Sequence, residues 1–236
     1  MSTVTFVPRS VERIELGIVA AYLTRSPGPV LIDAGLPGQE ARLARALERR
    51  GVHPGELGAV VVTHVHADHV GGARALADRF GAPLLAPEGG AAQARSGRNA
   101  PGRFTNPLLR LAERLGAPAG RFPPFEADEL LRDGDRLDRV GLAATVVATP
   151  GHTDHDLSLL LDDGALLLGD LLGGHLLRPD RPVLPFVLHD EVAWRASLRR
   201  VAALPVGRAY PGHGRAFGAD ALRAYAARRN TPAAGR

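Results

Sequence analysis

The sequence predicts a mixed α/β fold, and three patterns carry this prediction. The apolar run Ala59-Val60-Val61-Val62 indicates a buried strand within residues 57–63. An amphipathic helix pattern follows at residues 73–80. Two apolar runs, 157–161 and 165–168, flank the turn Asp162-Asp163-Gly164 and predict a β-hairpin. Strand and helix patterns thus follow one another along the chain.

The helix at residues 73–80 is predicted from the spacing of its apolar residues. Ala73, Leu76, Ala77 and Phe80 recur at the i, i+3, i+4, i+7 positions of one helical face. Gly81 can end the helix because glycine readily adopts the left-handed conformation that follows many helices.

Further elements are expected in the second half of the chain. Apolar runs at 141–148 and 206–210 are typical of strands. A helix is predicted over residues 191–203, and we expect Val192, Leu198 and Val201 to face inward.

The segment after the first predicted strand carries four potential metal ligands within six residues. His64, His66, Asp68 and His69 lie on a turn between this strand and the following helix. Imidazoles and carboxylates suit zinc, iron and manganese. On such a turn, the first two histidines can point to one ion while Asp68 and His69 point to another. One helical face would not allow this so easily, because positions i and i+2 do not face each other.

Three more potential ligands each follow a predicted strand. His152, Asp170 and His213 lie in glycine-containing loops, where the backbone can turn toward an ion. Seven ligands suggest two ions.

At this point the sequence resembles the metallo-β-lactamase superfamily. Its motifs occur in order over about residues 12–230: Leu31-Ile32-Asp33-Ala34-Gly35, then His64-x-His66-x-Asp68-His69, His152, Asp170 and His213. The resemblance implies a four-layer αββα sandwich with metals at the sheet edges. It places His64, His66 and His152 at one metal site, and Asp68, His69 and His213 at the other. Asp170 would bridge the two ions, and Asp33 would orient the ligand loop without binding metal.

Departures from the family patterns narrow the interpretation. The chain has no Cys, which some lactamase branches need in the second site, and it has Asp170, which the remaining branch usually lacks. The site therefore resembles those of hydroxyacylglutathione hydrolases, lactonases and phosphodiesterases. After His152, the sequence Thr153-Asp154-His155-Asp156 replaces the common continuation. We regard His155, His175 and His189 as candidates for contacts with substrate or with the ligand residues.

The expected activity is hydrolysis of an ester, thioester or lactone by metal-bound hydroxide, as in hydroxyacylglutathione hydrolases or lactonases. Two cations lower the pKa of a shared water toward neutrality. Asp170 would fix their spacing, and Asp68 would accept a proton as the tetrahedral intermediate forms. Zinc is the expected metal, and iron and manganese also suit these ligands.

Several alternatives stay open. The leading one is a mononuclear iron sulfur dioxygenase, which would use His64, His152 and Asp170 and would not need His213 as a ligand. A phosphodiesterase or nuclease, a β-lactamase and a non-catalytic binding module are the others.

One domain is expected over residues 1–236, because the candidate ligands run from His64 to His213 and a division would split the site. An irregular segment at about 88–128 resembles a lid. Within it Phe104, Phe122 and Phe125 either line an apolar acyl pocket or anchor the segment to the core. A loose tail is expected at about 231–236.

Composition limits the partners. The formal net charge is +4, 45% of the residues are hydrophobic, and all 29 basic residues are Arg, which excludes Schiff-base chemistry on Lys. No apolar stretch reaches the roughly 18 residues of a membrane span. The start of the chain lacks a signal-peptide pattern, so we expect a cytoplasmic protein. We expect a small-molecule substrate and no membrane or nucleic-acid partner. The oligomeric state is open, and a homodimer is compatible with the sequence.

Overall fold

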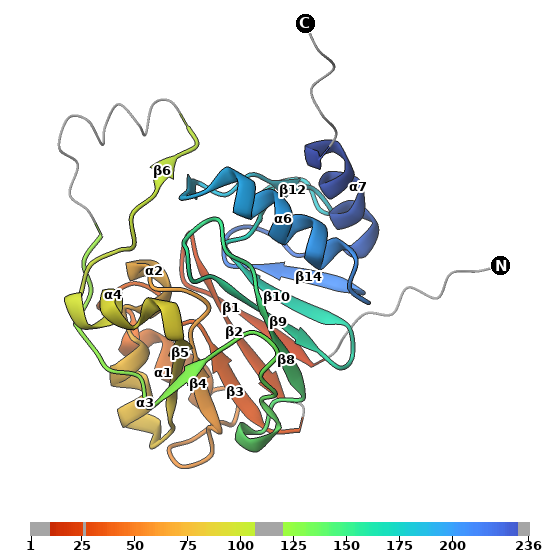
Figure 1. Cartoon of the computed structure of the whole chain (residues 1–236). Coiled ribbons are helices and arrows are strands. Elements are labelled where there is room, and N and C mark those ends of the chain that lie inside the picture. Colours follow the sequence, from red (N-terminus) through yellow and green to blue (C-terminus); the bar gives the residue numbers. More distant parts are fainter. Residues whose placement is uncertain (1–9, 26, 107–119, 231–236) are drawn as a thin grey trace, which may run out of the picture.

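Two β-sheets form the centre of the computed structural model, which describes residues 10–25, 27–106 and 120–230 (Figure 1). In spatial order, the first sheet consists of β1 (Val11–Glu15), β2 (Ala20–Arg25), β3 (Pro29–Ile32), β4 (Ala59–Val61), β5 (Leu84–Pro87) and β7 (Glu129–Leu131). The second consists of β15 (Phe217–Gly218), β14 (Arg208–Pro211), β10 (Ala165–Gly169), β9 (Leu157–Leu161) and β8 (Ala144–Ala148). Strands β9 and β10 pair antiparallel, which confirms the predicted hairpin.

Helices and two short strand pairs complete the described structure. The helical segments are α1 (Glu40–Glu48), α2 (Ala67–Val70), α3 (Ala73–Phe80), η1 (Glu88–Gly90), α4 (Ala91–Ser96), η2 (Asp138–Val140), α6 (Glu191–Ala202) and α7 (Ala219–Asn230). The short pairs are β11 (Gly173–Gly174) with β12 (Pro182–Val183), and β6 (Arg103–Phe104) with β13 (Val187–Leu188). The prediction for α3 is confirmed, because the helix ends before Gly81, whose φ of 64° is left-handed.

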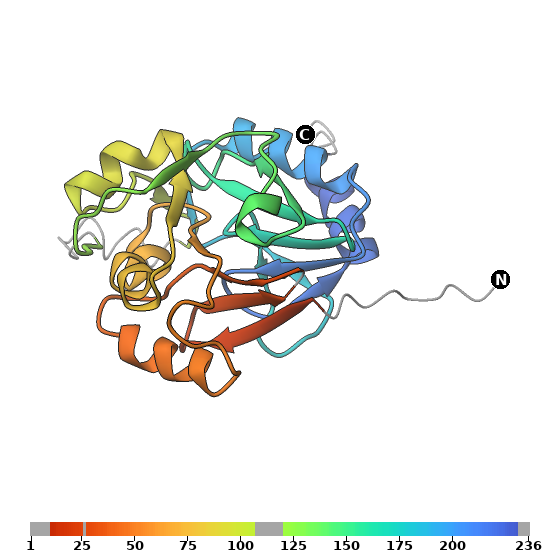
Figure 2. The same ribbon diagram turned by 90° about the horizontal axis from the view of Figure 1, so that it is seen from below.

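The elements form four layers. Figure 2 shows α1 and α3 on one side of the paired sheets and α6 and α7 on the other. Alternating strand residues point to different layers. In β3, Val30 and Ile32 pack between the sheets, whereas Leu31 faces the helices. In β10, Leu167 lies between the sheets and Leu166 packs toward α6 and α7. The predicted αββα sandwich is therefore confirmed.

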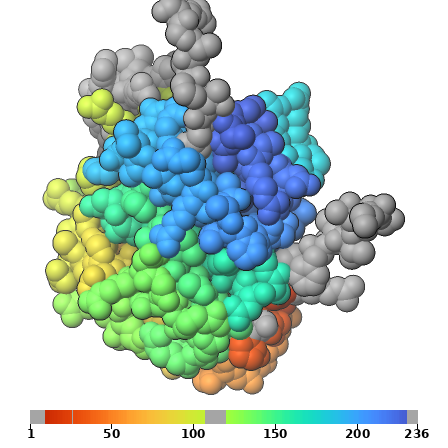
Figure 3. Space-filling view, turned by 45° about the vertical axis from the view of Figure 1, so that its right-hand side comes forward, coloured from red at the N-terminus to blue at the C-terminus, as the bar shows by residue number. Residues whose placement is uncertain are grey.

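Helix α6 differs from the prediction in the face that it buries. Val192 is 79% exposed, so the prediction that it faces inward is wrong. Trp194, Leu198 and Val201, at the i, i+4 and i+7 positions, are buried instead. Asp190 caps the helix by accepting hydrogen bonds from the backbone N–H groups of Val192 and Ala193. Val192 lies about 180° around the helix from Val201 and therefore faces away from this apolar stripe. Figure 3 shows α6 and α7 side by side on one face of the molecule.

Strand β4 ends earlier than predicted. The predicted strand runs to Thr63, whereas the strand stops at Val61. The backbone N–H of Thr63 donates to the Asp33 carboxylate (2.8 Å) and so takes no part in the sheet ladder. The chain leaves the sheet here and enters the loop that carries the first candidate ligands.

The segment predicted as a lid is described in part, because residues 107–119 lie outside the described residues, as does the predicted tail at 231–236. Phe122 and Phe125 are buried in the core between the first sheet and its helices. Phe104 lies in β6, which pairs with β13. The three Phe side chains do not line the cavity described below. For Phe122 and Phe125, anchoring to the core is the correct alternative.

In the part of the chain that the structure describes, no helix is both long and apolar enough to cross a membrane.

Candidate metal centre

The first four candidate ligands lie between β4 and α3. His64 and His66 are in the loop that leaves β4, and His66 immediately precedes α2. Asp68 and His69 lie in the single turn of α2. The change from extended backbone to helix after His66 allows neighbouring side chains to point to different places, as the sequence predicts.

The other candidate ligands follow strands of the second sheet. His152 follows β8, Asp170 follows β10, and His213 follows β14. Strands β10 and β14 run parallel with Gly169 opposite Pro211, so their ends lie side by side. Gly212 is needed between them, because a Cβ atom there would lie 2.5 Å from Asp170 Oδ1 and 2.5 Å from His69 Cε1.

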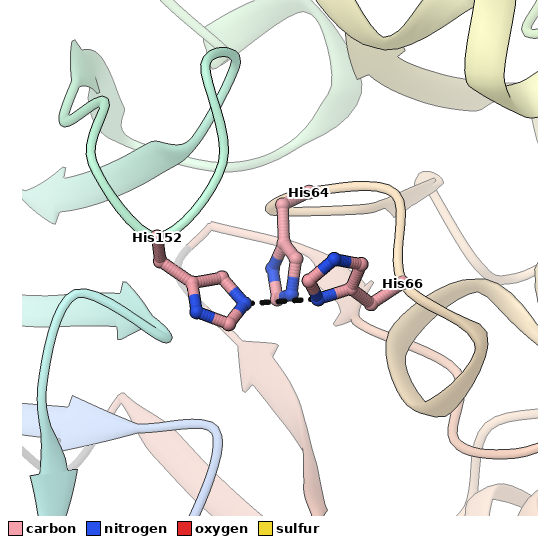
Figure 4. Close-up of side chains that lie close together, drawn as sticks. All are labelled: His64, His66 and His152. Atoms are coloured by element: carbon pink, nitrogen blue, oxygen red, sulfur yellow. Dashed lines mark hydrogen bonds between the residues drawn. The ribbon is translucent and has the colours of Figure 1, made fainter. Parts of the chain in front are cut away.

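All seven candidate ligands converge at one end of the sandwich. Their potential ligand atoms form three groups, and within each group these atoms lie within 4.8 Å of one another. The groups are His64, His66 and His152; His64, His69 and Asp170; and Asp68, His69 and His213. Figure 4 shows the first group, in which His64 and His66 from one loop meet His152 from the other sheet.

Hydrogen bonds fix which nitrogen of each histidine of the first group faces the centre. Nδ1 of His152 lies 2.8 Å from the carbonyl oxygen of Val187, and Nε2 of His66 lies 3.2 Å from that of Ala100. A carbonyl oxygen only accepts, so these nitrogens carry the protons. Nδ1 of His64 lies 3.1 Å from Oγ1 of Thr63, whose hydroxyl donates to Asp33 and therefore accepts from the imidazole.

The histidines of the other group are held in the same way. Nδ1 of His69 donates to the carboxylate of Asp33 (2.8 Å), and Nδ1 of His213 donates to the carbonyl oxygen of Ile18 (2.8 Å). All five imidazoles thus have an outward hydrogen bond and a second nitrogen directed at the centre. Such an outer partner is typical of histidines that bind metals.

The inward-facing atoms fit a cation. Nδ1 of His66 and Nε2 of His152 are 2.9 Å apart, although the proton of each ring lies on its other nitrogen. Two lone pairs that face each other at this distance repel unless a cation lies near both. Nε2 of His64, Nε2 of His69 and Oδ1 of Asp170 are buried without a hydrogen-bond partner among the described residues. Buried polar atoms are rarely left without a partner, and a bound cation would supply one to all three.

Distances at the second group also suit metal coordination. Nε2 of His213 lies 3.1 Å from Oδ2 of Asp68 and 3.2 Å from Oδ2 of Asp170, and Nε2 of His69 lies 3.4 Å from Oδ1 of Asp170. Ligands about 2.0–2.2 Å from a tetrahedral ion lie about 3.3–3.6 Å apart, and the three distances are within about 0.2 Å of this range. Asp170 also has Oδ2 3.6 Å from Nε2 of His152 in the first group, so its carboxylate lies between the two groups. The cluster fits a dinuclear metal site.

The two groups differ in electrostatics. Burial, followed by the neighbouring imidazoles, lowers the pKa of His64 well below its usual value and that of His66 to about 3. These rings are therefore neutral, as metal ligation requires. Burial acts in the same direction on His69 and His213, but the Asp170 carboxylate outweighs it and raises the pKa of His213 to about 10. The surroundings of His69 and His213 therefore stabilise a positive charge.

Asp33 occupies the position that the resemblance implies, next to the ligands and not among them. Its Oδ1 accepts from the Thr63 backbone and its Oδ2 accepts from His69. Its φ of 61° is unusual for a residue other than glycine. The carboxylate therefore connects the first ligand loop to a histidine of the second group.

His155 contacts the loop that carries the first ligands. It is buried, and its Nε2 accepts a hydrogen bond from the backbone N–H of Val65 (3.2 Å), between His64 and His66. Its Nδ1 donates to Asp154 (2.7 Å), which fixes the tautomer. His155 therefore supports the backbone of the ligand loop, and neither of its nitrogens belongs to the three ligand groups.

His175 and His189 lie outside the three ligand groups. Nδ1 of His175 accepts from the backbone N–H groups of Leu177 and Arg178, both at 3.1 Å, and so supports a turn. His189 is exposed, and its Nδ1 donates to the carbonyl oxygen of Pro101 (3.2 Å). The His189 contact joins two distant segments, whereas the His175 contacts stay within one turn.

Two further positioning residues, Thr63 and Asp156, are not among the predicted site residues. Asp156 is buried, which raises its pKa, and it accepts from the backbone N–H and the hydroxyl of Thr153, both at 2.6 Å. These hydrogen bonds hold the turn that directly follows His152. The spacing Thr153-x-x-Asp156 is a signal for such a local turn. Thr63 lies directly before His64, but its role depends on Asp33, thirty residues away.

Comparison with known proteins identifies a matching family. A model of the Metallo-beta-lactamase superfamily matches residues 15–213. The lactamase-like protein vrtG of Penicillium aethiopicum is 30% identical over 189 residues, which are 80% of this chain and 48% of vrtG. A hydroxyacylglutathione hydrolase of Acidiphilium cryptum is 34% identical over 136 residues, which are 58% of this chain and 42% of the hydrolase. The chain spans about half the length of the curated relatives it matches.

Solved structures share the fold. TTHA1623 in a di-iron-bound form matches with a TM-score of 0.65 and 29% identity, covering 91% of this chain and 97% of that one. BJP-1, a subclass B3 metallo-beta-lactamase of Bradyrhizobium japonicum, matches with a TM-score of 0.67 and 19% identity, covering 93% of this chain and 87% of that one.

Proposed function

Because this chain belongs to the metallo-beta-lactamase superfamily, we propose that it is a hydrolase that binds two divalent ions and cleaves an ester, thioester or lactone in a small-molecule substrate. In the proposed ligand set, His64, His66 and His152 hold one ion. Asp68, His69 and His213 would hold the other, and Asp170, whose carboxylate lies between the two groups, would be shared by both ions. Zinc is the first choice of metal, and iron and manganese are alternatives with the same ligands.

One observation carries this proposal: the outward hydrogen bonds of the five candidate histidines. Each imidazole is bound at its outer nitrogen by a carbonyl, a hydroxyl or a carboxylate, and its other nitrogen is directed at a shared centre. Histidines that serve only packing have no reason to share this arrangement. It holds the rings in place before an ion binds, and it selects the tautomer that can bind one.

The chain supplies no nucleophile of its own in this proposal. When bound, two divalent ions lower the pKa of a shared water toward neutrality and polarise the scissile carbonyl. Asp170 sets the separation of the two ligand groups. Asp68 has a side chain that is 25% exposed and lies beside His213, so it can receive a proton at the open side of the site. Both carboxylates are the proposed catalytic residues.

The similarity to a hydroxyacylglutathione hydrolase supports hydrolysis, and the di-iron form of TTHA1623 supports a two-metal site. A mononuclear iron dioxygenase would need three of the seven residues. The hydrogen bonds that orient His69 and His213 would then have no purpose. The similarity to BJP-1 is a similarity of fold and does not favour β-lactam hydrolysis.

The experiment that tests this proposal measures metal content and hydrolysis together. Purified, metal-loaded protein would be assayed with thioesters, carboxylic esters, lactones, phosphodiesters and β-lactams. We expect turnover of the first three classes, and we expect His64→Ala and Asp170→Ala each to reduce kcat/KM by orders of magnitude with the fold retained by circular dichroism. Preferential turnover of phosphodiesters or β-lactams would contradict the proposal.

Ser158 provides the matched control. It is buried, and its hydroxyl donates to the carbonyl oxygen of Leu168 (3.3 Å) and lies 3.0 Å from Oγ1 of Thr149. Because these contacts are structural, Ser158→Ala should change kcat by less than about tenfold, which is about 1.4 kcal/mol of barrier. A loss of several orders of magnitude, or a trapped ester on Ser158, would show that a side chain is the nucleophile.

A further inference from the structure

A cavity of about 220 Å³ adjoins the candidate metal centre. Two candidate ligands, Asp170 and His213, form part of its wall. Four glycines contribute backbone, and the remaining lining residues are Ile18, Leu176, Val183, Leu184, Pro185 and Phe186. Apart from the two candidate ligands, every side chain that substrate atoms would touch in this cavity is therefore apolar.

The apolar wall is attached to the ligands themselves. The carbonyl oxygen of Ile18 accepts the hydrogen bond of His213, and the ring of Phe186 lies edge-on to the His213 imidazole with centroids 5.5 Å apart. The Phe186 carbonyl oxygen also accepts from the backbone N–H of Thr105 (2.7 Å). These contacts make the wall a preformed part of the site.

Three of the lining side chains are large, apolar and exposed. Ile18 and Leu176 are each 69% exposed, and Phe186 is 54% exposed. Exposed apolar side chains that gather around one cavity mark a binding surface for an apolar group. Scattered single ones would carry no such meaning.

Charge in the cavity comes from the candidate ligands alone. The other ten lining residues are apolar or glycine, so none of them offers a cationic or polar side chain to a carboxylate of the substrate. Burying an unpaired charge is costly, whereas burying a methylene group is favourable. The lining therefore discriminates against substrates that carry an anionic group close to the scissile bond.

We propose that the substrate carries an uncharged hydrocarbon group within a few bonds of the scissile carbonyl, and that this group lies in the cavity between Ile18 and Phe186. The substrate class is thus a lipophilic ester, thioester or lactone, in contrast to a thioester with charged groups near the reacting bond. This inference rests on the proposed function, which supplies the scissile carbonyl at the metal centre.

The test uses metal-loaded protein and two series of thioesters. In the first series the thiol is constant and the acyl group lengthens from acetyl to hexanoyl; in the second series the acyl group is acetyl and the thiol lengthens. We expect kcat/KM to rise about threefold to fourfold per methylene in one series until the cavity is filled. Succinyl in place of butanoyl should lower kcat/KM by at least tenfold. A flat response in both series, or a preference for succinyl, would overturn the inference.

Variants locate the effect in the cavity. Phe186→Ala should flatten the dependence on chain length, with metal content measured on the same sample. The matched control is Leu130→Ala, which removes another exposed apolar side chain that does not line this cavity. An unchanged chain-length slope in Phe186→Ala would overturn the assignment to this cavity.

A binding measurement separates this inference from the proposed function. Hexanoate and acetate would be titrated into the metal-loaded protein by calorimetry, and we expect hexanoate to bind at least tenfold more tightly. If no ester, thioester or lactone is cleaved but this preference exists and is lost in Phe186→Ala, the proposed function fails and the apolar cavity stands. If hydrolysis occurs without any dependence on chain length, the function stands and the inference fails.

Discussion

At the scale of single residues, the outer hydrogen bonds of the histidines decide the geometry of the site. Asp33 illustrates this best, because one carboxylate binds both the Thr63 backbone and the His69 imidazole. It adopts a left-handed φ of 61° to do so. Such a backbone conformation costs free energy and persists where the surrounding contacts require it.

Asp33→Asn should therefore weaken metal binding. An amide has one acceptor oxygen, so it cannot accept from Thr63 and His69 in the way that a carboxylate does. We expect the metal affinity to fall by about 10-fold to 100-fold, as measured by competition with a chromogenic chelator. Asp78→Asn is the control, because Asp78 forms an exposed i,i+4 ion pair with Arg74. Equal affinities of the Asp33 variant and the parent would show that Asp33 has no positioning role.

At the scale of elements, α6 supports the loop that carries His152. The hydroxyl of Ser197 donates to the carbonyl oxygen of Pro150 (2.7 Å). Gly151 lies against the start of the helix, and a Cβ atom at this glycine would lie 2.4 Å from Cα of Trp194. The helix is therefore part of the scaffold of the site, although it contributes no candidate ligand.

Gly151→Ala should disrupt this contact. Its φ of 144° is strained for any side chain, and the added methyl group would also clash with the α6 backbone. Gly134→Ala is the matched control, since Gly134 also has a positive φ, of 86°, but a methyl group added there would have nothing within 4 Å. Gly134→Ala should lower the free energy of unfolding by about 1–2 kcal/mol because of backbone strain. Gly151→Ala should lower it further and should also reduce the metal content. If urea unfolding showed the same decrease in the free energy of unfolding for Gly151→Ala and Gly134→Ala, the proposed contact would be contradicted.

Asp133 connects α6 to the end of β8 and makes the stability of the fold depend on pH. It accepts from Arg200 (2.9 Å) and from the backbone N–H of Ala148 (2.8 Å), and the Arg200 hydrogen bond holds its pKa below the usual value. A lowered pKa in the folded state means that the carboxylate stabilises the fold above its unfolded pKa, about 3.9, and loses this contribution as pH falls through the folded pKa.

Asp133→Asn should therefore be less stable than the parent at pH 7, and the difference should shrink on acidification below about pH 4. Urea unfolding of metal-free protein at several pH values measures this. Arg200→Gln should show the same trend, because it removes the partner. A difference that is constant with pH would rule out the ionised pair as its origin.

At the scale of the whole molecule, the candidate metal centre joins the two halves of the sandwich. His64, His66, Asp68 and His69 follow a strand of the first sheet, whereas His152, Asp170 and His213 follow strands of the second. Bound ions would therefore connect the sheets at one end. A ligand that binds the folded state alone stabilises it, by about 2.7 kcal/mol at a concentration 100 times its Kd.

Metal removal should accordingly lower the thermal stability. For a chain of this length, a loss of that size corresponds to a fall in Tm of about 5–10 °C. Differential scanning calorimetry before and after treatment with a chelator measures it, and readdition of zinc should restore the Tm. Elemental analysis of fully loaded protein should give two ions per chain. A stoichiometry of one ion would contradict the dinuclear site.

The sequence by itself determined the candidate ligands and the main elements near them. His64, His66, Asp68 and His69 are adjacent in the chain, and the others follow recognisable apolar strands, so local patterns were sufficient. The helix before Gly81 and the hairpin were predicted for the same reason. In α6 the prediction was wrong because it grouped apolar residues without helical spacing: Val192 lies about 180° around the helix from Val201 and so on the opposite face.

The tertiary structure decided the contacts between distant segments. Asp33 reaches Thr63 and His69, His155 reaches the backbone of Val65, and Ile18 accepts from His213 across 195 residues. The apolar cavity likewise combines side chains from three separate parts of the chain. A single sequence shows which residues could bind an ion, because that is a property of each side chain. Which nitrogen faces the ion, and what lines the space beside it, depend on distances that only folding creates.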